Sequence, residues 1–180
     1  MSLIGKACIS GLIGILGFQS LLASVKPYLS VSGEVATILD GGFERRTGSG
    51  MLSELGMDWR SENSNGWNAQ IDAQWYVGDD LSGSKVGDFF VFSNLIRSEG
   101  VRLNRVQFGY ESDEKNFSWK VGLLLLDDDF MGSDYAALFT NSAFGPLAIE
   151  SANLPAPIFP LSAPGLWTGM DMSDSWFVHA

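Results

Sequence analysis

A two-residue alternation of apolar and polar side chains limits the fold of this chain more than any other feature. It is clearest in residues 67–77, whose odd positions are apolar: Trp67, Ala69, Ile71, Ala73, Trp75 and Val77. The positions between them are polar or amphipathic: Asn68, Gln70, Asp72, Gln74 and Tyr76. Successive side chains of a strand point to opposite faces of its sheet. The pattern therefore predicts a strand with one apolar face and one polar face.

Similar patterns predict strands along most of the chain. They cover 29–39, 51–59, 103–111 and 117–125, with a shorter strand at 89–95 and a last strand that begins near Leu166 and runs to the end. Asn65-Gly66, between two of these segments, is a strong hairpin signal. Five of the six prolines lie from Pro146 onward. Because proline is excluded from ladder interiors, we predict a long irregular loop over 127–165, with a short helix around 135–139.

Composition excludes several classes of protein. Glycine accounts for 21 of 180 residues and aromatic residues for 12%, which fits neither a helical bundle nor a disordered chain. The net charge of −10 argues against a nucleic-acid partner. The single cysteine, Cys8, and the single histidine, His179, supply too few residues for an intrachain disulfide, a zinc site or a histidine-activated nucleophile. We therefore predict no metal, no cofactor and no enzymatic activity.

The N-terminal segment has the features of an export signal. Lys6 supplies a positive charge, and Ala7–Ala23 contains no charged residue. This run is short for a membrane-spanning helix but suits the apolar region of a secretory signal. We predict a signal peptide at 1–24; a buried N-terminal helix is the alternative.

The alternation is compatible with two kinds of all-β protein. Trp67 and Trp75 lie on the same face, roughly 26 Å apart along a strand. In a strand tilted by about 40°, this separation approaches the height of the apolar band of an outer-membrane barrel, whose two edges carry aromatic residues. We therefore predict an antiparallel transmembrane β-barrel. The alternative is an exported soluble β-sandwich that binds glycans, with the tryptophans in its core.

Three motifs in the C-terminal half carry a family resemblance. They are Asp127-Asp128-Asp129-Phe130, the segment Ala137-Leu138-Phe139-Thr140-Asn141-Ser142-Ala143-Phe144-Gly145, and Asn153-Leu154-Pro155-Ala156-Pro157-Ile158-Phe159-Pro160. This stretch resembles the carbohydrate-selective porins of Gram-negative outer membranes. The resemblance implies a channel for passive, sugar-selective diffusion, with small neutral sugars and outer-membrane lipid as partners and a possible homo-oligomer.

The number of predicted strands is small for a complete barrel. We count about six to seven strands, whereas the smallest bacterial barrels need about eight. The last residues, Ser175–Ala180, fall within a predicted strand. We therefore expect residues 25–180 to be the N-terminal part of a porin barrel; a complete small barrel is the alternative.

Two groups of residues are candidates for the sugar pathway. The polar strand faces supply residues predicted to face the lumen: Glu54, Asp58, Asp72, Arg105, Gln107 and Lys120. The long loop supplies residues predicted to lie near the pore: Asp127, Asp128, Asp129, Phe139, Asn141 and Phe144. Aromatic residues such as Phe139 and Trp167 would either stack on sugar rings or pack the loop against the wall. If the acidic residues 127–129 line the pore, we expect cations and neutral sugars to pass more readily than anions.

Overall fold

The chain forms one antiparallel sheet in which every strand pairs with its neighbours in sequence. The structure, a computed structural model of the 180-residue chain, describes residues 11–13, 24–61, 66–88, 91–112, 116–130, 132–133, 135–146, 156–173 and 175–180. Within these described residues, the sheet has eight strands in the order of the chain. They are β1 (Gly11–Ile13), β2 (Val25–Thr37), β3 (Thr47–Arg60), β4 (Trp67–Gly78), β5 (Gly100–Glu111), β6 (Phe117–Leu124), β7 (Ala163–Ser173) and β8 (Trp176–His179).

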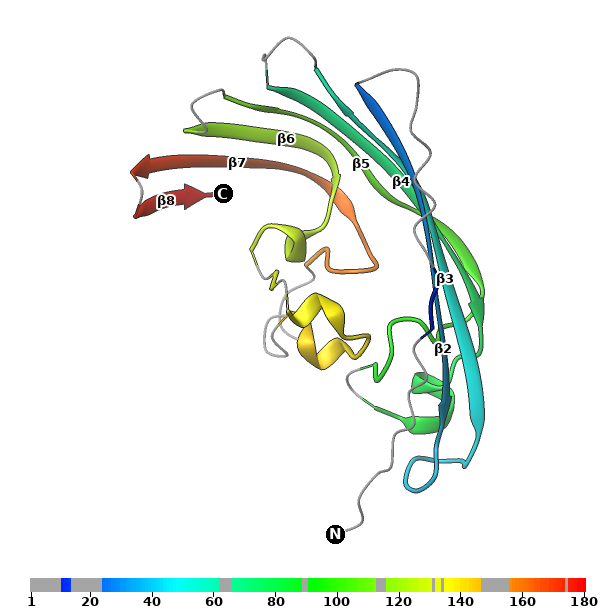
Figure 1. Cartoon of the computed structure of the whole chain (residues 1–180). Coiled ribbons are helices and arrows are strands. Elements are labelled where there is room, and N and C mark those ends of the chain that lie inside the picture. Colours follow the sequence, from blue (N-terminus) through cyan, green and yellow to red (C-terminus); the bar gives the residue numbers. More distant parts are fainter. Residues whose placement is uncertain are drawn as a thin grey trace.

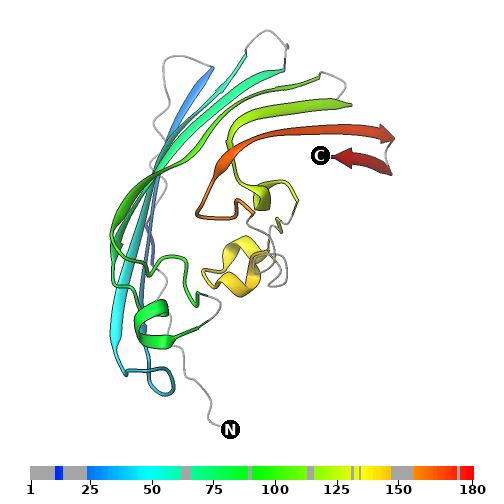
Figure 2. The same ribbon diagram turned by 180° about the vertical axis from the view of Figure 1, so that it is seen from behind.

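The sheet is strongly curved, and two long connections lie on its concave side (Figures 1 and 2). We call residues 79–99, between β4 and β5, the first excursion, and residues 125–162, between β6 and β7, the second excursion. The first contains a π-helical turn, η1 (Ser82–Val86). The described part of the second contains three 3₁₀ turns, η2 (Leu126–Asp128), η3 (Ala136–Leu138) and η4 (Ser142–Phe144). Within the described residues, no helix is long and apolar enough to cross a membrane.

The two faces of the sheet have opposite polarity, and the polarity is the reverse of that in a water-soluble protein. The convex outer face exposes large apolar side chains, including Leu55, Ile71, Trp75, Val101, Phe108, Val121, Leu166 and Met170. The concave inner face carries buried polar side chains, including Glu34, Asp72, Gln74 and Asn104. Apolar side chains exposed in this number need an apolar surrounding, whereas buried polar groups need hydrogen-bond partners.

Aromatic side chains gather on the outer face near one end of the strands. Trp67 stacks on Phe108 with ring centroids 5.3 Å apart, and it meets the edges of Tyr110 and Trp119 at 5.1 and 5.8 Å. Trp75 lies further along β4 on the same face, paired with Val101. This distribution matches the predicted aromatic edges of a barrel and leaves the tryptophans outside any core.

The fold class predicted from the sequence is confirmed: the chain is all-β and antiparallel, with the strand pattern of a barrel wall. The β-sandwich alternative needs two packed sheets, and the described residues form one. Strand β4 begins at Trp67, as the alternation predicts, and Gly66 precedes it with φ of +66°. A Cβ at Gly66 would collide with the backbone carbonyl of Glu111, so glycine is required there.

Two strand predictions were wrong. Residues 91–95 form no strand and belong to the first excursion, and the rest of the predicted strand, 89–90, lies outside the described residues. The last strand, predicted to run from Leu166 to the end, is two strands, β7 and β8, which pair with each other. The short helix predicted around 135–139 is present as the single turn η3. The predicted signal peptide, 1–24, lies outside the described residues except for Gly11–Ile13, which pair with β2, and Ser24, and it stays a prediction.

A β-bulge in β5 changes which residues share a face. Asp72 pairs with Arg105 and Ala73 pairs with Leu103, so Asn104 is an extra residue in β5. Strict alternation would place Leu103 on the same face as Arg105. Instead Leu103 is exposed on the outer face, and both Asn104 and Arg105 meet inner-face side chains.

Candidate functional site

The structure places all six strand residues assigned to the lumen on the inner face of the sheet. They are Glu54, Asp58, Asp72, Arg105, Gln107 and Lys120. The residues paired with them on adjacent strands are mostly polar residues or glycines, because the polar positions of one strand pair with the polar positions of the next. Their role in permeation stays a prediction.

A chain of hydrogen bonds crosses the inner face from β2 to β4. Ser30 Oγ donates to Glu54 Oε2 at 3.2 Å, and Gln74 Nε2 donates to Glu54 Oε1 at 2.8 Å. The Tyr76 hydroxyl donates to Gln74 Oε1 at 3.1 Å. Both oxygens of Glu54 are therefore occupied, and the side chains of three strands hold one another in place.

A second set of bonds lies nearer the other end of the same strands. Gln107 Nε2 donates to Gln70 Oε1 at 2.7 Å, and Gln70 Nε2 approaches the Tyr28 hydroxyl at 3.5 Å. The ring of Tyr28 fills the space that a Cβ on Gly56 would take. Tyr28 of β2, Gln70 of β4 and Gln107 of β5 thus present amide and hydroxyl groups to the concave side.

The bulge in β5 builds a charged cluster on this wall. Asn104 Nδ2 donates to Asp72 Oδ1 at 2.7 Å. Arg105 Nε lies 3.9 Å from Asp72 Oδ2 and 3.0 Å from Asp128 Oδ2, in the second excursion. Because Asp72 and Asn104 are almost completely buried, the guanidinium group of Arg105 compensates charge that water does not reach.

The acidic triplet anchors the second excursion to the wall. Asp127 accepts the backbone N–H of Phe159 at 3.1 and 3.2 Å through its two oxygens. Asp128 pairs with Arg105, and Asp129 Oδ1 pairs with Lys120 Nζ at 2.6 Å. Burial is the largest effect on both Asp127 and Asp128, and it raises the pKa of each carboxyl. Each of the three aspartates therefore contacts a basic side chain or a backbone N–H of the protein.

The first excursion packs into a gap in the inner face that glycines create. Leu81 occupies the position that a Cβ on Gly48 would take, and the backbone of Leu95 and Ile96 does the same at Gly50. Leu81 and Ile96 are each 1% exposed, so they form part of the small apolar core of the molecule.

A buried polar contact adds to this packing. Ser93 Oγ donates to Glu34 Oε2 on β2 at 2.7 Å, and both side chains are buried. The first excursion is thus held by β2 and β3, whereas the second is held by β5 and β6.

The two excursions contact each other in front of the wall. Asn94 N donates to Thr140 O at 2.7 Å, and Ser142 N donates to Val91 O at 3.1 Å. The side chain of Ser142 also donates to Asn94 Oδ1 at 2.9 Å. Together they form one connected structure on the concave side of the sheet (Figure 1).

The remaining predicted loop residues belong to this connected structure. Asn141 caps η4, because its side chain accepts the N–H of Ala143 at 2.8 Å. Phe139 and Phe144 stack on each other with centroids 4.4 Å apart, and both are about half exposed, at 55% and 51%. This arrangement leaves apolar ring surface accessible to solvent, so stacking on a sugar stays a prediction.

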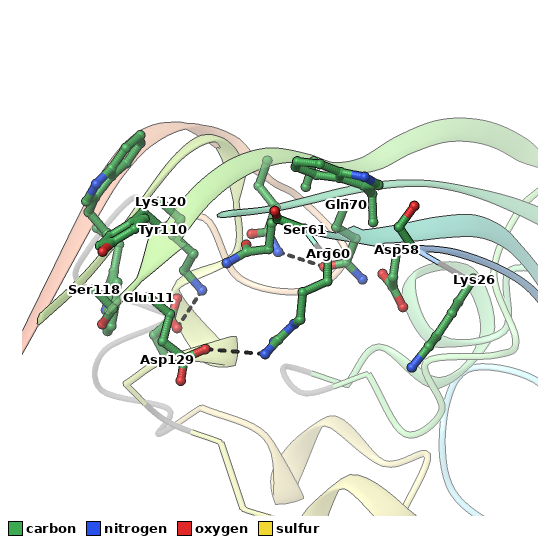
Figure 3. A pocket seen from close by; sticks show the side chains of 17 residues that line it. Lys26, Asp58, Arg60, Ser61, Gln70, Tyr110, Glu111, Ser118, Lys120 and Asp129 are labelled. Carbon is green, nitrogen blue, oxygen red and sulfur yellow. Dashed lines mark hydrogen bonds and ion pairs between the residues drawn. The ribbon is translucent and has the colours of Figure 1, made fainter. Parts of the chain in front are cut away.

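A hollow of about 870 Å³ opens on the inner face where the strands are joined by short turns (Figure 3). Its charged lining residues are Lys26, Asp58, Arg60, Glu111, Lys120 and Asp129. Two ion pairs lie in it: Arg60–Glu111 at 3.7 Å and Lys120–Asp129 at 2.6 Å. The indole of Trp167 lies beside the second pair, with Lys120 Nζ 5.2 Å from its centroid. The hollow has the mixed charge and hydrogen-bonding capacity of a hydrated passage.

The described part of the chain contains no group of three or more histidine, cysteine, aspartate or glutamate side chains that could hold a metal ion.

Comparison with known proteins identifies the family. The family model described as carbohydrate-selective porin, OprB family, matches residues 65–180. The chain belongs to this family. The family is one of outer-membrane transport channels, which agrees with the inverted polarity of the sheet and with the resemblance of the three motifs. No curated protein matches the porin chain in sequence.

A solved structure shows the same fold. The porin chain is similar to OprB of Pseudomonas putida, in a structure described as its high-pH form, with 19% sequence identity and a TM-score of 0.73. The similarity covers 87% of this chain and 40% of that chain. The chain therefore spans less than half the length of the solved porin it resembles.

Several inner-face residues of this porin were absent from the sequence-based prediction. Glu34, Gln74 and Asn104 lie at polar positions of strands, but alternation alone does not rank one polar position above another. Arg97 and Arg102 also lie on the concave side, one in the first excursion and one in β5. Charge density was the available signal, because Arg97, Arg102 and Arg105 lie within nine residues of sequence.

Proposed function

We propose that this porin chain lines a water-filled channel through which small carbohydrates diffuse passively across the outer membrane. The observation that carries the proposal is the inverted polarity of the sheet. Polar side chains are buried on the concave side, and large apolar side chains are exposed on the convex side. A wall of this kind separates lipid from water, with water on the concave side.

The outer face is suited to contact with lipid. Leu55 and Val101 are 63% and 76% exposed, which in water would leave a large apolar surface uncovered. The strands hydrogen-bond to both neighbours through most of the sheet, so few backbone groups would meet hydrocarbon. Outer-membrane lipid is therefore the proposed partner of this face.

The inner face carries hydrogen-bond donors and acceptors that a sugar needs when it leaves bulk water. Gln70, Gln107 and Glu54 present donors and acceptors that replace part of the hydration of a hydroxylated solute. These groups already bond to one another, so each offers only part of its hydrogen-bonding capacity. Contacts with the solute would then be weak and exchangeable, as passage through a channel requires.

The connections give the proposed orientation in the membrane. The β3–β4, β5–β6 and β7–β8 connections are short, whereas the β2–β3, β4–β5 and β6–β7 connections are longer and lie at the opposite ends of the strands. Bacterial barrels place short turns toward the periplasm and longer loops toward the outside. The two excursions would therefore enter the channel from its external side.

The test is sugar flux through the protein purified from its own outer membrane and placed in liposomes. Gln107→Trp puts a large side chain on the inner face, and Val106→Trp puts the same side chain on the outer face at the adjacent position. We expect Gln107→Trp to lower glucose-driven swelling several-fold and Val106→Trp to leave it unchanged. Equal effects of the two substitutions, or no swelling with any neutral sugar, would contradict the proposal.

A further inference from the structure

The hollow beside the short turns, which we call the turn-end hollow, has a balanced set of charges. Its lining contains three basic and three acidic side chains. Four of them form the ion pairs Arg60–Glu111 and Lys120–Asp129. The other two, Lys26 and Asp58, form no ion pair and no side-chain hydrogen bond with the residues that the structure describes. The hollow thus has no net charge, and two opposite charges in it are uncommitted.

The strand register holds these two side chains next to each other. Lys26 on β2 pairs with Asp58 on β3, and Asp58 pairs with Gln70 on β4. All three line the hollow, and Lys26 and Asp58 are exposed. Figure 3 shows Lys26 and Asp58 at one side of the hollow, with Glu111 and Asp129 at the other. Adjacent strands lie about 4.8 Å apart, so a solute of the size of a sugar ring can reach all three side chains.

An ammonium group, a carboxylate and an amide in one row match the chemistry of adjacent hydroxyl groups. The two oxygens of a carboxylate can accept from two hydroxyls, and an ammonium or amide N–H can donate to the same hydroxyl oxygens. A hydroxyl that donates to a carboxylate becomes a better acceptor, so the bonds strengthen one another. An ion-paired side chain would first have to leave its partner, whereas Lys26 and Asp58 have no partner to leave.

We propose that Lys26, Asp58 and Gln70 bind two adjacent hydroxyl groups of a neutral sugar at the turn end of the channel. This inference rests on the proposed function and adds a binding site to it. Asp58 accepts from both hydroxyls, and Lys26 and Gln70 donate to their oxygens. Gln70 Oε1 is occupied by Gln107, whereas Gln70 Nε2 makes only a 3.5 Å approach to Tyr28, so its N–H groups have capacity left.

The arrangement favours a neutral solute over a charged one. A carboxylate on the solute would be attracted by Lys26 and repelled by Asp58 at the paired position, and a cationic group would meet the reverse. A pair of hydroxyls uses both charges at once. Because both side chains are exposed, water competes for the same groups. The solute is then held weakly enough to leave, as conduction requires.

The test compares methyl α-glucoside with its 3-deoxy analogue, in which no two hydroxyls lie on neighbouring carbons. The protein purified from its outer membrane is studied in planar bilayers, and the concentration of each solute that half-blocks the current is measured. We expect Asp58→Asn to raise this concentration about fivefold for methyl α-glucoside, because a charged acceptor becomes a neutral group. The value for the 3-deoxy analogue should not change.

Further variants control for indirect effects. Asp40→Asn makes the same change of charge at an exposed residue of the β2–β3 connection, and it should leave both values unchanged. Lys26→Gln should raise the value for methyl α-glucoside and leave that for the 3-deoxy analogue unchanged. Heat-modified migration in gels shows whether each variant has folded.

Protection of an introduced thiol locates the site without changing its residues. In a Cys8→Ser background, Asn68→Cys places a thiol in the hollow, on the same face as Gln70, and Ser84→Cys places one in the first excursion. Methyl α-glucoside should slow the reaction of a thiol reagent at position 68 and leave the reaction at position 84 unchanged. The 3-deoxy analogue should protect position 68 less.

The outcomes distinguish the two proposals. If methyl α-glucoside passes or blocks, the hydroxyl site is overturned by an unchanged value in Asp58→Asn, by an equal change for both solutes, or by no protection at position 68. The sugar channel stands in each of these cases. If neither solute passes or blocks, the proposed function fails and the hydroxyl site fails with it.

Discussion

The side-chain amide of Asn104 donates a 2.7 Å hydrogen bond to the carboxylate of Asp72, and both side chains are sealed from solvent. The pair exists because the bulge in β5 sets Asn104 and Arg105 opposite one residue of β4. A carboxylate 2% exposed is costly unless its oxygens find donors. The bulge supplies an amide donor at Oδ1, whereas Oδ2 has no hydrogen-bond partner among the described residues and lies 3.9 Å from Nε of Arg105.

Asn104→Ala should therefore destabilise the folded protein by about 1–3 kcal/mol, because it leaves a buried carboxylate oxygen without its donor. The measurement is equilibrium unfolding from lipid vesicles in urea. Leu103→Ala, at the adjacent outer-face position, removes apolar contact without affecting Asp72 and should preserve the inner-face bonds. An unchanged midpoint for Asn104→Ala would show that Asp72 does not depend on this amide.

Gly50→Ala should displace the first excursion from the wall, because the new Cβ would meet the backbone of Leu95 and Ile96. Backbone atoms yield less readily than a flexible side chain. We expect faster protease cleavage within residues 79–99 and a larger channel conductance. Gly100→Ala is the matched control, since a Cβ there has no atom within 4 Å. Equal cleavage of the two variants would contradict this packing.

Ile71→Arg should reduce stability in a lipid refolding assay by about 2–4 kcal/mol, because Ile71 is exposed on the outer face near the middle of β4. Gln70→Arg, one residue away, places the same side chain on the hydrated inner face and should have little effect on folding. The assignment of faces fails if the two substitutions are equally harmful.

The docking of the second excursion should strengthen as the pH falls. The pKa values of Asp127 and Asp128 are raised in the folded chain, chiefly by burial. A raised pKa favours the protonated carboxyl in the docked state, so its stabilising contribution is present at low pH and is lost as the pH rises through the raised value. The change should begin above the ordinary aspartate pKa of about 3.9.

The mobility of a spin label at the exposed position Leu138 measures this docking. Mobility should decrease between neutral pH and pH values just above 4, and the double variant Asp127→Asn, Asp128→Asn should show a much smaller change. A label that becomes more mobile on acidification would mean that loss of the Arg105–Asp128 ion pair outweighs the relief of burial.

The N-terminus of the protein in the outer membrane should lie near Val25, as the predicted signal peptide requires. Mass spectrometry of the purified protein measures it directly. Cleavage there would remove β1, whose residues Gly11–Ile13 pair with Val31–Gly33 of β2. Recovery of peptides that contain Gly11–Ile13 from the membrane protein would instead support the alternative, in which this segment is retained.

The sequence predicts best what depends on local alternation. Residues 67–77 are recognisable as a strand because their side chains alternate with a two-residue period. The same alternation assigns the faces, with Ile71 outward and Gln70, Asp72 and Gln74 inward. The bulge at Asn104 is different: one extra residue reverses the phase of Leu103, and the sequence around it carries no clear mark of the insertion.

The sequence pattern also does not predict contacts between segments that are distant in the chain. Residues 91–95 include apolar residues typical of a strand. In the structure, however, the backbone at Leu95 packs against Gly50 of the wall, and the segment pairs with no strand. The bond between Ser93 and Glu34 joins residues 59 apart in sequence, and nothing local to either residue predicts it. The pairing of Asp128 and Asp129 with basic residues likewise required the folded chain.

The anchoring of the two excursions has a consequence for the order in which the protein assembles. Ser93 requires Glu34 of β2 in place, and Asp129 requires Lys120 of β6, so each attachment point belongs to a strand already registered with its neighbours. Strand pairing between consecutive segments closes short loops first, whereas the bond between Ser93 and Glu34 joins residues 59 apart in sequence. The sheet would therefore form as successive hairpins before the two excursions dock on its concave side. The narrowing of the passage would come last, as a separate maturation step after membrane insertion.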